Sequence, residues 1–184
     1  MTDETVLTTR RIYDGRVVSL RVDTVRTPTG LEVQREIVEH RGAVAVVAID
    51  EQNRVLLIRQ YRHAAEKALV EIPAGTLDPD EDAAECASRE LMEETGYTAA
   101  RVERFGGIHL SPGFCTEYIH LFQATGLAQG QARPEADEHI EVEAVAWPEA
   151  LRRVRSGHIE DAKTVAALLL ADALRRPSVR DGAP

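Results

Sequence analysis

The segment from Gly75 to Tyr97 constrains this chain more than any other, because it places several acidic residues on one face of a predicted helix. It reads GTLDPDEDAAECASRELMEETGY. An α-helix turns by about 100° per residue, so Glu90, Glu93 and Glu94 lie side by side on it. Like charges at this spacing destabilise an isolated helix. A bound divalent cation would reverse that penalty, and Mg²⁺ prefers such carboxylate oxygens.

A solvent-exposed acidic helix is the alternative interpretation, and a bare E-x-x-E-E pattern would favour it. Further features argue against it: glycines bracket the segment, Arg89 directly precedes the first glutamate of the pattern, and Glu71-Ile72-Pro73-Ala74-Gly75 leads into it. Arginine presents a planar fork of donors, which suits it to fixing a neighbouring carboxylate. We therefore interpret the segment as a cation site that Arg89 supports.

The segment resembles the Nudix box, G-x5-E-x7-R-E-U-x-E-E-x-G-U, in which U is an apolar residue. Every fixed position is matched, and only Tyr97 departs from the aliphatic residue that is usual there. The resemblance implies an α/β fold, a Nudix-type α/β/α sandwich in which helices enclose a mixed sheet. It assigns a Nudix hydrolase domain to residues 42–176, preceded by a small N-terminal antiparallel β extension over residues 1–41.

The composition limits the kinds of partner that we expect. A length of 184 residues suffices for one domain with a small appendage. The formal net charge of −9 argues against a nucleic-acid partner. No apolar run reaches the roughly 18 residues that span a bilayer, and the first residues lack a signal-peptide core, so we expect a cytoplasmic protein without a membrane partner. Cys86 and Cys115 lack zinc-ligand spacing, and Cys86 falls on the apolar side of the box helix.

Hydrophobic periodicity predicts that strands dominate the rest of the chain. Residues 16–23 and 31–38 are predicted to form a hairpin. The apolar run Gly42–Ile49 is typical of a strand buried on both faces. Gly96 is the expected C-cap of the box helix. Further strands are expected at 55–60, 100–110, 118–124 and 141–147, helices at 148–156 and 161–176, and a disordered tail at 177–184.

Short motifs outside the box refine the resemblance. Gln60-Tyr61-Arg62, Glu71-Ile72-Pro73-Ala74-Gly75 and the turn Ser111-Pro112-Gly113 are similar to motifs of the ADP-ribose pyrophosphatase branch of the Nudix hydrolases. That branch implies Mg²⁺-dependent hydrolysis of ADP-ribose to AMP and ribose 5-phosphate by a metal-activated water, with Mn²⁺ and Zn²⁺ as alternative ions.

The resemblance also assigns metal-binding and catalytic roles. It implies that Glu90, Glu93, Glu94 and the carbonyl of Ala74 are metal ligands, that Glu94 is also catalytic, and that Arg89 supports the catalytic group. A glutamate from the acidic stretch at residues 133–143 is implied as a ligand or general base. Our choice there is Glu138, while Glu135 and Asp137 remain open.

Substrate contacts are expected at residues outside the box. Arg62 is our choice for a bidentate phosphate clamp, and Arg59 fits either substrate binding or an exposed surface. The turn at Pro112 is a further substrate contact. The resemblance implies that the N-terminal extension pairs with a second subunit in a homodimer, where Arg35 and Glu36 are candidates for contacts to adenosine.

Other functions stay open at this point. The box acts on the diphosphate alone, so other nucleoside diphosphate sugars, such as GDP-mannose, or dinucleotides could be the substrate. A function of a different class is a non-catalytic module that binds ADP-ribose, which the intact Glu90, Glu93 and Glu94 disfavour. A structural protein whose acidic helix merely binds cations is disfavoured by the bracketing glycines and the nearby arginines.

Overall fold

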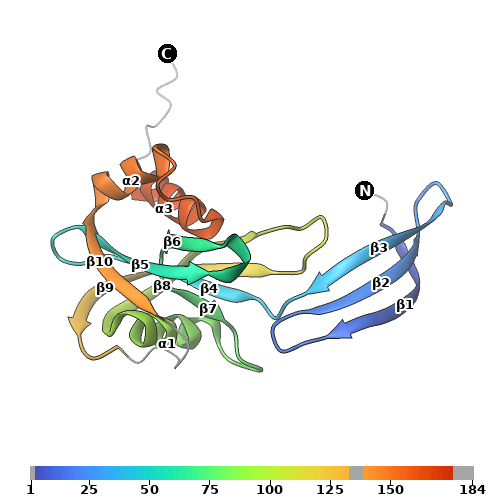
Figure 1. The fold of residues 1–184 in the computed structure, drawn as a ribbon, viewed down its shortest axis with the longest axis horizontal. Coiled ribbons are helices and arrows are strands. Elements are labelled where there is room, and N and C mark those ends of the chain that lie inside the picture. The colour runs from blue at the N-terminus through green and yellow to red at the C-terminus, as the bar shows by residue number, and fades with distance from the viewer. Residues whose placement is uncertain (1–2, 133–138, 176–184) are drawn as a thin grey trace, which may run out of the picture.

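The structure, a computed structural model, describes residues 3–132 and 139–175. Figure 1 shows a body of sheets between helices, and an N-terminal sheet that extends away from this body. Helix α1 (Ala83–Thr95) covers one side of the body, while α2 (Trp147–Arg155) and α3 (Ala162–Arg175) cover the other side. The predicted α/β/α sandwich is thereby confirmed.

Strand β4 (Ala43–Ala48) forms the centre of the body, and all of its residues are buried. Its odd-numbered residues belong to a core cluster that includes Leu168 of α3. Its even-numbered residues belong to a second cluster that includes Leu91 of α1. A strand with a core on each face must be apolar at every position, which explains its uninterrupted run of alanine and valine.

The sheet around β4 is mixed, as predicted. β4 pairs in parallel with β9 (Tyr118–Gln129) and antiparallel with β7 (Ala74–Thr76). β8 (Tyr97–His109) pairs antiparallel with β9 and completes the order β7-β4-β9-β8. The register sets Gly75 of β7 opposite Val44, so the start of the box lies at the edge of this sheet.

A second sheet packs in the body with the order β10-β5-β6, and its strands are antiparallel. The strands are β5 (Arg54–Arg62), β6 (Lys67–Glu71) and β10 (Ile140–Ala146), and the 3-10 helix η1 (His63–Ala65) joins β5 to β6. Only Ile72 and Pro73 separate β6 from β7. The two sheets are therefore connected directly before the box.

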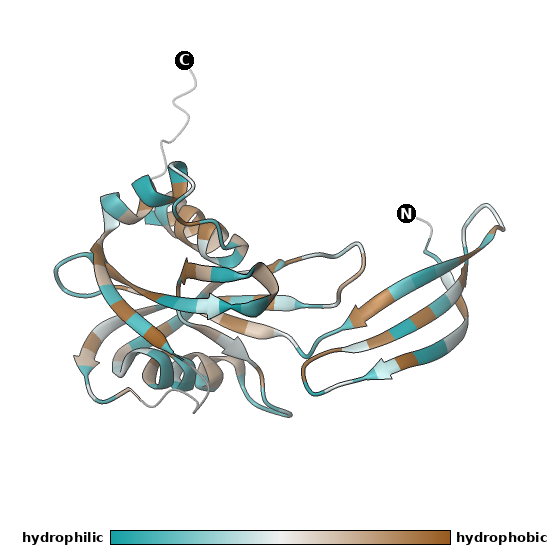
Figure 2. Ribbon diagram, in the orientation of Figure 1, coloured by the Kyte–Doolittle hydropathy of each residue, from teal (hydrophilic) through white to brown (hydrophobic). Residues whose placement is uncertain are grey.

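The predicted N-terminal hairpin is confirmed as the antiparallel pair β2 (Ser19–Arg26) and β3 (Glu32–Glu39), but the sheet has a third strand, β1 (Thr5–Asp14), that was not predicted. The order of this sheet is β1-β2-β3. β1 shows no alternation of apolar and polar residues, because nearly all of its residues are exposed and polar side chains occur on both of its faces. Figure 2 shows hydrophilic and hydrophobic residues interspersed along this sheet. Ion pairs from Arg11 and Arg21 to Glu39 connect all three strands.

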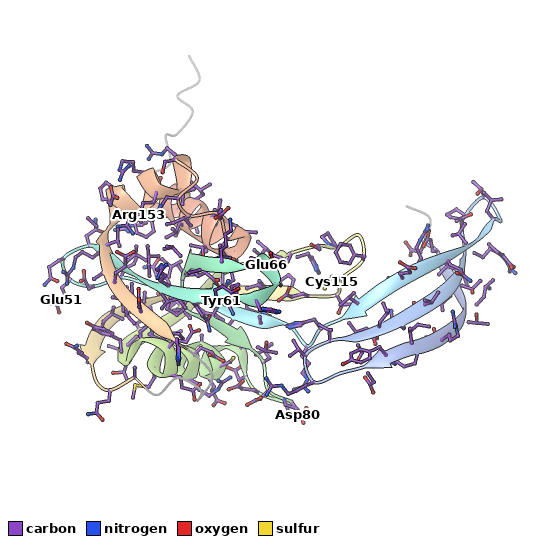
Figure 3. All side chains as sticks on the ribbon, in the orientation of Figure 1. Glu51, Tyr61, Glu66, Asp80, Cys115 and Arg153 are labelled. Carbon is purple, nitrogen blue, oxygen red and sulfur yellow. The ribbon has the colours of Figure 1, made fainter. Side chains whose placement is uncertain are left out.

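The end of the N-terminal sheet is hydrogen-bonded to the loop between β8 and β9. The N–H of Val38 donates to the carbonyl of Phe114 at 2.8 Å, and the N–H of Thr116 donates to the carbonyl of Val38 at 3.0 Å. Figure 3 shows Cys115 on this loop, facing the N-terminal sheet. The end of β3 is therefore held beside the body by backbone hydrogen bonds.

The other predicted strands and helices are confirmed, although several ends differ. β8 begins at Tyr97, and β9 continues to Gln129, because the two strands pair along their whole length across one bulge. The predicted disordered tail at 177–184 lies outside the described residues. Within the described ranges, no helix is long and apolar enough to cross a bilayer.

Candidate active site

Helix α1 is fixed by caps at both ends. Asp82 accepts hydrogen bonds from the N–H groups of Ala84 at 2.8 Å and Glu85 at 3.3 Å. Gly96 ends the helix with φ of 76°, a left-handed conformation that favours glycine, so the predicted C-cap is confirmed. Leu91 anchors the buried face of the helix on β4. These constraints set the direction in which the glutamates of the box point.

Consecutive residues of β7 touch two of these glutamates. The N–H of Ala74 donates to a carboxylate oxygen of Glu94 at 2.9 Å, and Glu94 is buried. A Cβ atom at Gly75 would lie 1.9 Å from the carboxylate of Glu90. Only glycine therefore lets Glu90 lie against the strand.

Arg89 links the acidic residues of the box. Its Nε and Nη2 donate to the carboxylate of Glu81 at 2.8 and 2.9 Å. Its Nη1 donates to Glu90 at 2.7 Å and to Glu93 at 2.9 Å. The hydrogen bonds from Arg89 lower the pKa of Glu81 to about 2, and those contacts raise the pKa of Arg89 in turn. Arg89 thus offsets the repulsion between Glu90 and Glu93.

Cys86 lies beside this network without the properties of a nucleophile. It is buried on the face of α1 that packs against β4. Burial, together with the nearby Glu81 carboxylate, raises the pKa of the Cys86 thiol to about 12. The reactive form of a cysteine is the thiolate, so this thiol is unreactive at neutral pH.

A cavity of about 400 Å³ opens beside the glutamates of α1. Its walls bring opposite charges together: Glu90, Glu93 and Glu94 line it, as do Arg16, Arg41, Arg62 and Arg89. The loop between β7 and α1, on which Figure 3 labels Asp80, extends toward the N-terminal sheet and contributes Asp78 to the wall. In a protein with a net charge of −9, this concentration of arginine marks a place for an anion.

The oxygen donors of the cavity fit a hard divalent cation. The carboxylates of Glu90, Glu93 and Glu94 could hold it together with the backbone of Ala74, and the close approach at Gly75 leaves room for Glu90 to do so. In the described parts of the chain, no three acidic, histidine or cysteine side chains already converge on one point. Arg89 instead donates to one oxygen of Glu90 and one oxygen of Glu93, so a cation that bound there would compete with Arg89 for these carboxylates.

The two predicted arginines of β5 have different surroundings. Arg62 lines the cavity and donates two hydrogen bonds of 2.8 Å to the buried carboxylate of Glu71. Those bonds raise the pKa of Arg62 despite its partial burial. Arg59 pairs with Glu141 at 3.4 Å on an exposed surface and does not line this cavity. The structure therefore brings Arg62, but not Arg59, to the glutamates of the box.

The remaining predicted substrate contacts lie apart from the cavity of the same chain. Arg35 pairs with Glu4 at 2.6 Å on the N-terminal sheet, and Glu36 is exposed on the same strand. Pro112 lies in the predicted turn, which is confirmed by the hydrogen bond from the N–H of Phe114 to the carbonyl of Ser111 at 3.1 Å. None of Arg35, Glu36 and Pro112 is among the residues that line the cavity.

Glu138 and its alternatives, Glu135 and Asp137, lie outside the described residues. Sequence reasoning overlooked Arg16 and Arg41, because single arginines in a turn and a linker form no motif. It also gave no separate role to Glu71, although a charged residue between Val70 and Ile72 is a sign of a buried ion pair.

We predict that Gly75→Ala displaces the Glu90 carboxylate and lowers kcat/KM by about 100-fold, because a misplacement of about 1 Å can cost that much in an active site. The unfolding free energy should change little, because the group that must move is the end of a flexible side chain. Steady-state kinetics and urea denaturation measure the two effects.

Glu90→Ala is the matched background for this test. In that background, Gly75→Ala should cost less than threefold in kcat/KM, because the clashing carboxylate is absent. An equal loss in both backgrounds would contradict a direct contact between Gly75 and Glu90.

Comparisons with known proteins agree with this geometry. The family model described as the NUDIX domain matches residues 39–168. The chain is 43% identical over 178 residues to the methanol dehydrogenase activator of Bacillus methanolicus, which covers 94% of this chain and 96% of that protein. It is 39% identical over 168 residues to the ADP-ribose pyrophosphatase of Bacillus subtilis (strain 168), with 90% and 91% of the two chains covered.

A solved structure titled as an ADP compounds hydrolase has the same fold. Its TM-score is 0.84 at 21% sequence identity, and the match covers 95% of each chain. The family match includes the box helix, the strand that contacts it and most of the two sheets. The chain belongs to the Nudix family.

Proposed function

We propose that this protein hydrolyses the diphosphate of ADP-ribose to AMP and ribose 5-phosphate, and that Mg²⁺ is its divalent ion. Hydrolases of this family generally need a divalent metal. The observation that carries the proposal is the cavity in which Glu90, Glu93 and Glu94 face four arginines. The name of the relative from Bacillus subtilis, ADP-ribose pyrophosphatase, supports the choice of substrate.

The cavity offers separate groups for the metal and for the substrate. Glu90, Glu93, Glu94 and the carbonyl of Ala74 would hold the metal, which neutralises phosphate oxygens and lowers the pKa of water when it is bound. The guanidinium of Arg62, held in plane by Glu71, would donate hydrogen bonds to the diphosphate.

At the attacked phosphorus, hydrolysis forms one bond to oxygen and breaks another. The oxygen of water attacks one phosphorus, and the bond from that phosphorus to the bridging oxygen breaks. A carboxylate accepts the proton of the water, and we propose Glu138 for this role, with Glu135 and Asp137 as the alternatives on the same segment. The departing phosphate carries the negative charge that Arg62 and its neighbours stabilise.

Hydrolysis of another nucleoside diphosphate sugar, or of a dinucleotide, is the second candidate function. It rests on the fact that the glutamates recognise only the diphosphate. A non-catalytic module that binds ADP-ribose is disfavoured, because the carboxylates of the box are intact and line a cavity.

A substrate panel distinguishes these functions. The protein is incubated with Mg²⁺ and ADP-ribose, GDP-mannose or a dinucleotide, and the nucleotide products are separated by chromatography. We expect AMP from ADP-ribose, with a kcat/KM at least tenfold above that of the other substrates. Preference for GDP-mannose would replace the substrate in our proposal, and the absence of any product would favour the binding module.

We predict that Glu94→Gln lowers kcat by about 100-fold or more and changes KM by less than threefold, because a metal ligand stabilises mainly the transition state. Steady-state kinetics with ADP-ribose measures both values. Glu85→Gln is the control, since Glu85 lies in the first turn of α1 and does not line the cavity. A Glu94→Gln enzyme with near-normal kcat would contradict the role of this residue.

We further propose that the chain forms a homodimer through its N-terminal sheet. Val6, Ile12, Tyr13 and Leu31 are large apolar residues that are exposed on this sheet, where a second copy would cover them. Such pairing would leave Arg35 and Glu36 available for adenosine contacts near a partner's cavity. Sedimentation velocity at micromolar concentration should give a species of two chains, and a single-chain species would remove this proposal.

A further inference from the structure

A buried carboxylate, that of Glu71, is hydrogen-bonded to Arg62 and is not among the groups that line the cavity. Glu71, the last residue of β6, has no exposed surface. Arg62 donates to both of its carboxylate oxygens at 2.8 Å. Lys163, from the first turn of α3, donates to the same Oε2 atom that receives Nη2 of Arg62. Two cations from different elements therefore meet on one carboxylate.

Arg62 and Lys163 keep the buried Glu71 carboxylate ionised. Burial alone would raise the pKa of Glu71, but Arg62 and Lys163 outweigh this effect and hold the pKa below its usual value. Lys163 also donates to Asp161 at 3.1 Å, so two cations face two carboxylates. Glu71 itself is buried, so removal of either cation would leave its negative charge less compensated, which is costly.

The first turn of α3 is also attached to the segment between β6 and β7. Asp161 accepts hydrogen bonds from the N–H of Thr164 at 3.0 Å and from its hydroxyl at 2.6 Å. The N–H of Ile72 donates to the Thr164 hydroxyl at 2.9 Å. α3 thus holds the side chain of Glu71 and the backbone of the next residue, two positions before Ala74.

This arrangement restricts the guanidinium of Arg62. Its Nε and Nη2 both donate to Glu71, and these two hydrogen bonds fix the plane of the guanidinium. The same side chain lines the cavity with Glu94, whose charge contributes to the raised pKa of Arg62. Any rotation of Glu71 would therefore turn Arg62 relative to the metal-binding face.

We propose that Lys163 is a positioning residue of the active site: by fixing Glu71, it holds Arg62 in the orientation that receives the diphosphate. This inference rests on the proposed function, because it assumes that Arg62 binds the substrate. Lys163 itself does not line the cavity, so it acts through Glu71.

A second ion pair between the same parts of the chain provides a control. Lys67 of β6 pairs with Glu160, just before α3, at 2.7 Å, and both side chains are half exposed. The side chain of Lys163, by contrast, is only 13% exposed. Exposed pairs contribute little to stability. Lys67 lies opposite Arg62 in the register of β5 and β6, but its side chain donates to Glu160, whereas the side chain of Lys163 donates to Glu71.

The test combines Lys163→Met with Arg62→Gln in a double-mutant cycle. With ADP-ribose as substrate, Lys163→Met should lower kcat/KM about tenfold, by raising KM and lowering kcat, because Arg62 both receives the diphosphate and stabilises the departing phosphate. In the Arg62→Gln background, Lys163→Met should change kcat/KM less than twofold, because the guanidinium that Lys163 positions is absent. Lys67→Gln should leave both kinetic constants unchanged within twofold. Equal losses from Lys163→Met in both backgrounds would overturn the proposal.

A second measurement does not depend on catalysis. The Nε–H of Arg62, bonded to Glu71, should give a slowly exchanging nitrogen-15 NMR signal, assigned by its disappearance in Arg62→Gln. Lys163→Met should increase the exchange rate of that proton at least tenfold, while Lys67→Gln should not. An unchanged exchange rate would overturn the positioning role. If the wild type cleaves no diphosphate, the proposed function fails, and the NMR signal alone decides whether Lys163 positions Arg62.

Discussion

Repulsion between the carboxylates of α1 is the physical constraint on which the rest of the site depends. Glu90, Glu93 and Glu94 share one side of the helix, and such charges stay together only where positive groups or hydrogen-bond donors face them. Arg89 supplies the positive charge for two of them, and the N–H of Ala74 supplies a donor for the third. Hydrolases of this family generally need a divalent metal, and a cation beside these carboxylates would add to the same compensation.

The segment between β6 and β7 connects the carboxylates of α1 to the rest of the fold. Several elements hold this segment and the residue before it: β5 and α3 hold the Glu71 side chain, α3 also holds the Ile72 N–H, and the Val46 N–H of β4 donates to the Pro73 carbonyl at 2.8 Å. Ala74 then meets α1. Both helical layers therefore determine where the backbone lies beside the glutamates. A substitution in either core cluster would therefore change the geometry of the cavity.

Much of this could be predicted from the sequence, because the strongest signals coincide with the most constrained parts. The all-apolar β4, the box helix and the Gly96 cap each follow from one local rule, and all are confirmed. β1 was missed because a strand exposed on both faces carries no period-two pattern. Arg59 and Arg62 are close in sequence, yet only the alternation of β5 shows which of them reaches the cavity.

Diffraction data from crystals soaked with Mn²⁺ and ADP-ribose, collected for anomalous scattering, test the central claim most directly. We predict that anomalous peaks in the cavity mark Mn²⁺ ions bound to oxygens of Glu90, Glu93 and Glu94. Arg89 should then have lost its hydrogen bond to at least one of these carboxylates. A cavity without such peaks, in which Arg89 still bridges Glu90 and Glu93, would contradict it.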